Sequence, residues 1–122
     1  MTLQGWLRDG RLTNYTTSPQ EIRDLRNAAA RDLRDCRIPE LSADWRFNIA
    51  YNAALRMATA ALAACGYRAS RDQHHLRIVH SLEFTVGADA GLIGVFDRFR
   101  KKRNIGTYER PGVRRDSVAI LP

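Results

Sequence analysis

The sequence predicts an all-α protein, an up-and-down helical bundle of four to five helices. Apolar residues recur at three- and four-residue spacing through most of the chain, which is the period of an amphipathic helix. Helix start and stop signals separate these runs from one another. No segment has the alternation of apolar and polar residues that is typical of a half-buried strand.

The chain has the length of one domain. A chain of 122 residues buries about two thirds of the surface of its unfolded form. We expect a single helical domain over residues 1–110 and a loosely ordered tail over residues 111–122. The first residues lack the apolar region of a signal peptide, and polar residues interrupt the most apolar segment. We therefore expect a cytoplasmic protein with no membrane partner.

The net charge is +7, which permits a polyanionic partner. Only Lys101 and Lys102 are lysines, and the other eighteen cations are arginines. Arginine excess in an alanine-rich chain fits a GC-rich coding bias. The position of each cation therefore carries more information than the total charge.

Two helices are expected in the first third of the chain. Residues 2–9 form a short helix, with Trp6 as its apolar anchor. The second helix begins after Ser18, with Pro19 at its first position. Glu21, three residues after Ser18, completes a capping box. Its outer face mixes Arg and Asp, which is typical of a solvated surface.

The third predicted helix, residues 42–65, is the longest and should be the central one, because it is apolar on most sides. Gly66 ends it. One narrow strip along it is polar, with residues four apart: Asn48, Asn52 and Arg56. We interpret the strip as the solvent-facing side of a mostly buried helix. The alternative is a polar wall that faces a cleft or a partner subunit.

A fourth helix is expected over residues 71–86. Ser70 and Gln73 repeat the capping-box pattern, and Gly87 ends the helix. All three histidines of the chain lie in this segment: His74, His75 and His80. No Asp, Glu or Cys accompanies them at metal-ligand spacing. We therefore predict no metal site and no cofactor.

The fifth helix begins near Ala88 and ends in a basic run. Leu92, Phe96 and Phe99 share one face of it, and the next position on that face is Arg103. The other cations of the run are Arg98, Arg100, Lys101 and Lys102. This pattern indicates either the solvated end of a helix or a charge directed at a ligand. Gly106 suggests a break or kink shortly after the run.

The order of helices and the sequence RN-x-x-x-Y resemble the HEPN superfamily, small all-α domains that often act as ribonucleases or RNA-binding modules. The stretch AYNAALRMATAALAACGYR looks like that family's central helix, and FDRFRKKRNIGTYE looks like its motif helix. The family motif is an arginine, often followed by a polar residue, with a histidine four to six residues later. Arg103 and Asn104 match the motif, whereas Tyr108 takes the place of the histidine.

The resemblance implies a homodimer paired through the motif helix, with RNA as its partner. In the family, the arginine and histidine of two subunits meet in a cleft and cleave RNA without a metal. The corresponding catalytic residues here would be Arg103, Asn104 and Tyr108. Tyrosine has an ordinary pKa of about 10 and is a poor base at pH 7, although it can donate a hydrogen bond or stack on a base. The nucleic-acid-binding residues would be Arg100, Lys101, Lys102 and Arg56.

A non-catalytic interaction module is the alternative that the missing histidine favours. The HEPN family also includes partners of nucleotidyltransferase-fold antitoxins. Such a partner would be a protein, and Tyr108 could then be the residue that it modifies.

Overall fold

The computed structural model describes residues 2–108, with side chains described as far as Arg103. Its elements in chain order are α1 (Leu3–Arg8), β1 (Leu12–Asn14), α2 (Pro19–Asp35), α3 (Ala43–Ala64), β2 (Tyr67–Ala69), α4 (His74–Thr85) and α5 (Ala90–Tyr108). The predicted all-α bundle is confirmed. The predicted tail, residues 111–122, lies outside the described residues.

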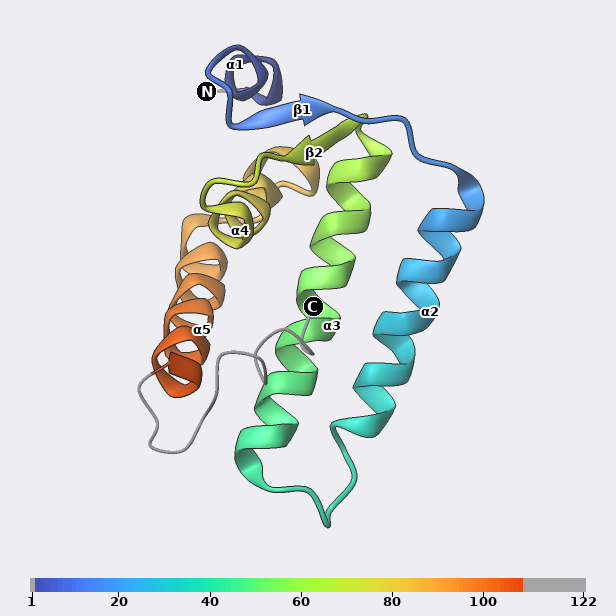
Figure 1. Ribbon diagram of the computed structural model, residues 1–122, viewed down its shortest axis with the longest axis vertical. Coiled ribbons are helices and arrows are strands. Elements are labelled where there is room, and N and C mark those ends of the chain that lie inside the picture. The colour runs from blue at the N-terminus through green and yellow to red at the C-terminus, as the bar shows by residue number, and fades with distance from the viewer. Residues whose placement is uncertain (1, 109–122) are drawn as a thin grey trace.

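Helix α3 is the central element. Figure 1 shows α3 with α2 along one side and α5 on the other, while α1 and the two strands cover one end of the bundle. Buried side chains occupy much of the length of α3, among them Tyr51, Leu55 and Leu62. Trp6 of α1 joins this core and meets Phe84 of α4 edge to face, with ring centroids 5.3 Å apart. The short first helix is thereby anchored as predicted.

A small antiparallel sheet was not predicted. Strand β1 pairs with β2, and Leu12 lies opposite Ala69. Both of these residues are buried. Strands of three residues are too short to show alternation, and their partners lie more than fifty positions apart in the sequence. The pairing therefore depends on tertiary structure, because α2 and α3 must fold back between the two strands.

Most predicted helix starts are confirmed. The Ser18 side chain accepts a hydrogen bond from the backbone N–H of Glu21, at 3.1 Å. The Glu21 carboxylate does not return to Ser18 as a capping box requires. It accepts hydrogen bonds from the Tyr15 and Thr17 hydroxyls instead.

The predicted start of the fourth helix is wrong. Helix α4 begins at His74, and its cap residue Gln73 has φ +52° and makes no side-chain capping bond. The reason is that Ser70 hydrogen-bonds to the residues just before β1 and therefore does not cap α4. Its backbone N–H donates to the Arg11 carbonyl at 3.0 Å, and its hydroxyl donates to the Gly10 carbonyl at 2.7 Å.

The solvent-facing interpretation of the polar strip on α3 is also wrong. Asn52 is buried, and the Arg56 guanidinium pairs with Asp32 of α2 at 2.9 Å. Asp32 belongs to the mixed-charge surface of α2, so one carboxylate of that surface turns toward α3.

Among the described residues, no helix combines the length and apolar character that crossing a bilayer requires.

Gly66 gives a stability test of the turn between α3 and β2. Its φ is +94°, and an added Cβ would meet nothing within 4 Å, so the cost of Gly66→Ala is conformational. We expect a loss of about 1–2 kcal/mol in the free energy of unfolding, measured by urea denaturation.

Gly94→Ala is the matched control, because Gly94 lies within α5 and an added Cβ would be 3.9 Å from its nearest neighbour, the end of Arg98. It should stabilise by about 0.5–1 kcal/mol. Equal effects of the two substitutions would contradict the assignment of a left-handed turn at Gly66.

Candidate functional site

Arg103 is buried at the end of the basic run. Only 7% of its surface is exposed, and its Cζ lies 4.9 Å from the centroid of the Tyr51 ring. A desolvated cation–π contact of this kind contributes about 2 kcal/mol. Arg103 is therefore a packed residue, and the interpretation of its position as a solvated helix end is wrong.

The apolar line that leads to Arg103 is partly exposed. Leu92 and Phe99 are 57% and 46% exposed, whereas Phe96 is half-buried and meets Tyr51 edge to face at 5.6 Å. Tyr51 thus receives both Phe96 and Arg103 from α5. The spacing of the apolar residues and Arg103 predicted that they share one face of the helix. Arg103 is the most buried residue of that face.

The remaining cations of the run differ in their contacts. Arg100 pairs with Asp97 at 2.8 Å, and Lys101 reaches the same carboxylate at 3.4 Å. Lys102 is exposed, and its Nζ lies 5.0 Å from the centroid of the Phe47 ring. Partial burial raises the pKa of Asp97, but hydrogen bonds and charges from Arg100 and Lys101 outweigh it and lower that pKa below its ordinary value. Asp97 is therefore charged at neutral pH and offsets part of the positive charge.

Of the predicted site residues, one is not brought to this run and two have side chains that cannot be placed. Arg56 pairs with Asp32 of α2, and α2 and α5 lie on opposite sides of α3 (Figure 1). The side chains of Asn104 and Tyr108 lie outside the described residues. The α5 backbone is helical through Gly106 to Tyr108, so the predicted break is not observed.

Two histidines of α4 lie close to the run, which the sequence did not predict. Burial lowers the pKa of His75 to about 4, with further lowering by the positive charges of Arg103, His74 and Arg100. His75 is therefore a neutral imidazole at pH 7. Nε2 of His80 lies 3.8 Å from the Asp97 carboxylate. The position of His75 on the apolar face of its helix indicated that it is partly buried. Its neighbours on α5 could not be predicted, because they are far away in sequence.

An apolar groove lies between α3 and α5 beside the basic run. Its volume is about 270 Å³, and on α3 it is lined by Phe47, Ala50, Tyr51 and Ala54. The α5 side contributes Leu92, Val95 and Phe99, all of which are exposed. The site thus joins an open apolar surface to a cluster of cations.

Among the described residues, no group of three or more His, Cys, Asp or Glu side chains could hold a metal ion. Comparison with known proteins identifies no relative: no family model matches the chain, and no curated protein or solved structure matches it significantly. The likeness to the HEPN superfamily therefore stays a prediction from the motif.

The Arg103–Tyr51 contact can be measured by a double-mutant cycle. Tyr51→Leu and Arg103→Met remove the ring and the charge in turn. We expect a coupling of up to about 2 kcal/mol in urea unfolding, because the contact is buried.

The exposed Lys102–Phe47 pair supplies a matched second cycle, built from Lys102→Met and Phe47→Leu. Its coupling should be about 0.5–1 kcal/mol. If the buried cycle gave no more coupling than the exposed one, Arg103 would not be held by the ring.

The low pKa of His75 predicts an acid-dependent loss of stability. Below pH 6.5 the unfolded chain binds a proton at this histidine, whereas the folded chain does not until pH falls to about 4. The free energy of unfolding should therefore fall across this window, and His75→Gln should flatten that part of the profile. His80→Gln is the control. NMR titration of the ring protons measures the pKa directly, and an ordinary value for His75 would refute its burial beside Arg103.

Proposed function

We propose that this chain is an RNA-binding domain that acts as a homodimer paired through α5. The observation that carries the proposal is the position of the apolar groove directly beside the basic run of the same helix. A metal-independent ribonuclease is the enzymatic form of this proposal, as the HEPN-like motif implies.

The exposed side chains of α5 support self-association. Leu92, Val95 and Phe99 are 57%, 36% and 46% exposed, at helical spacing. Contiguous exposed apolar surface of this kind marks an interaction site. A two-fold pairing would cover the same surface on both subunits and bring the two basic runs toward one another.

The exposed cations of α5 support a polyanionic partner. Arg98, Lys101 and Lys102 are exposed on the helix whose apolar side would be paired. They would supply attraction that does not depend on sequence. Arg103 would grip a phosphate, as the resemblance implies, but the phosphate would have to take the place of the Tyr51 ring as its partner.

Catalysis would need a base, and tyrosine at position 108 is a poor one at pH 7. His75 is the described residue that we would test in this role, since it is neutral at pH 7. Burial and then the charge of Arg103 lower its pKa to about 4, which makes it a weak base in the free protein. The negative charge of a bound phosphate would raise that pKa toward neutrality. Asn104 would orient the phosphate, and Tyr108 would line the cleft. Both of these roles rest on the motif alone.

A protein-interaction module is the second candidate, and the groove itself favours it. All eight of the described residues that line the groove are apolar or aromatic. The partner could be a nucleotidyltransferase-fold protein, with Tyr108 as the residue that it modifies. Binding through apolar contacts would depend little on salt, which separates this candidate from RNA binding.

The RNA proposal predicts a steep salt dependence that originates in the basic run. Lys101→Ala/Lys102→Ala should reduce the slope of log affinity against log salt concentration by about 1.4. This value follows because each phosphate neutralised on a single strand contributes about 0.7. Fluorescence anisotropy with a labelled single-stranded RNA, over a range of salt concentrations, measures the slope.

The control is Arg23→Ala/Arg26→Ala, which removes the same charge from exposed positions of α2. Its slope should stay at the wild-type value, and an equal reduction in both variants would mean that only total charge matters.

The same samples with EDTA report cleavage. Loss of cleavage in Arg103→Ala, with the fold verified by circular dichroism, would support the ribonuclease form.

A further inference from the structure

A second cavity lies at the other end of α3, away from the basic run. Its volume is about 290 Å³, and α2, α3, β2 and α4 all contribute to its walls. Ala63, which lines it, follows Tyr51 by twelve residues, or about 18 Å along the helix. This volume is close to the lower end of the range for small-molecule sites. The cavity is thus a separate site from the one proposed to bind RNA.

The middle of the cavity is apolar. Leu25 of α2, Leu62 of α3 and Ile78 of α4 line it. Leu62 and Ile78 are only 2% exposed, so these walls are part of the rigid core. A ligand body placed here would be apolar and would meet a preformed surface.

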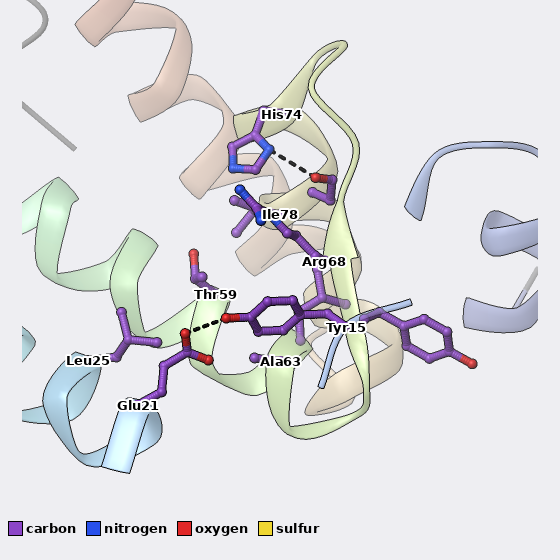
Figure 2. A pocket seen from close by; sticks show the side chains of 11 residues that line it. Tyr15, Glu21, Leu25, Thr59, Ala63, Arg68, His74 and Ile78 are labelled. Atoms are coloured by element: carbon purple, nitrogen blue, oxygen red, sulfur yellow. Dashed lines mark hydrogen bonds between the residues drawn. The ribbon is translucent and has the colours of Figure 1, made fainter. Parts of the chain in front are cut away.

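One end of the cavity carries a fixed negative charge. The two oxygens of Glu21 accept hydrogen bonds from the hydroxyls of Thr17 and Tyr15, and these bonds hold the pKa of Glu21 below its ordinary value. Figure 2 shows the Tyr15 hydroxyl directed at Glu21. Each oxygen already has one donor, and the positive charge of Arg68 also lowers the pKa of Glu21, so this carboxylate is stabilised without a bound cation. It also disfavours a second anionic group on any ligand.

The other end carries the cation Arg68 and the imidazole of His74 (Figure 2). Arg68 makes no ion pair with any carboxylate in residues 2–103, although its Cζ lies 5.8 Å from the Tyr15 ring centroid. Nδ1 of His74 lies 3.1 Å from the carbonyl oxygens of both Ala69 and Ser70. In the neutral ring, Nδ1 therefore holds the proton, and Nε2 is left as an acceptor.

We propose that this cavity binds a small organic monoanion with an apolar body, such as an aromatic carboxylate. The anionic group pairs with the Arg68 guanidinium, whose fork matches a carboxylate in two parallel hydrogen bonds. The body lies against Leu25, Leu62 and Ile78. Glu21, at the far end, selects against dianions.

The test uses phenylacetate and its uncharged analogue phenylacetamide as probes of the full chain. Chemical shifts of the cavity residues, followed by NMR titration, should change saturably with phenylacetate and at least tenfold more weakly with phenylacetamide. Arg68→Gln should weaken phenylacetate binding at least tenfold. Arg71→Gln is the matched control, because Arg71 is exposed and does not line the cavity.

Three results would overturn the proposal. They are no saturable change with phenylacetate, equal binding of the two probes, and equal binding by wild type and Arg68→Gln. Since Arg68 is exposed, Arg68→Gln should fold normally, and its thermal melting temperature verifies this. The outcome does not depend on RNA binding, so this proposal and the proposed function fail separately.

Discussion

Burial of α3 on several sides sets the position of the other elements. Alanines on this helix, such as Ala53, Ala58 and Ala60, are at most 5% exposed and allow neighbouring helices to approach closely. Its polar side is accommodated by the ion pair between Arg56 and Asp32 of α2. Both sites depend on this helix, because Tyr51 in its first half supports the basic run and its C-terminal end lines the second cavity.

The contact between Arg103 and Tyr51 shows how a cation can continue an apolar line. A guanidinium is more weakly hydrated than an ammonium and stacks on aromatic faces, so its burial costs less than that of lysine. The Tyr51 ring, which also packs against Phe96, offers it a fixed surface. Lysine occupies the exposed positions 101 and 102 of the same run, where a strongly hydrated charge remains in water.

Local signals in the sequence predicted most of the helices, but they could not predict which distant residues contact each site. The Ser18 cap and the glycine turns at Gly66 and Gly87 act within a few residues, so their positions were correct. The two-stranded sheet and the burial of Arg103 were missed because their partners lie about fifty residues away. The start of α4 was wrong for the same reason, since the sheet had already engaged its predicted cap. The second cavity combines four elements and left no local pattern.

The arrangement of side chains around α5 limits what a partner can be. With about 100° per residue, Phe96 and Arg103 form the side that faces the core, and Leu92 and Phe99 lie beside them. The exposed cations at positions 98, 101 and 102 follow farther round the helix. A second subunit that covers only the apolar side therefore leaves Lys102 at the border of the interface and Arg98 and Lys101 outside it, where all three remain accessible to RNA. A protein partner broad enough to cover both sides would have to present acidic residues opposite the cations. The charge of whatever binds α5 thus separates the two proposed functions.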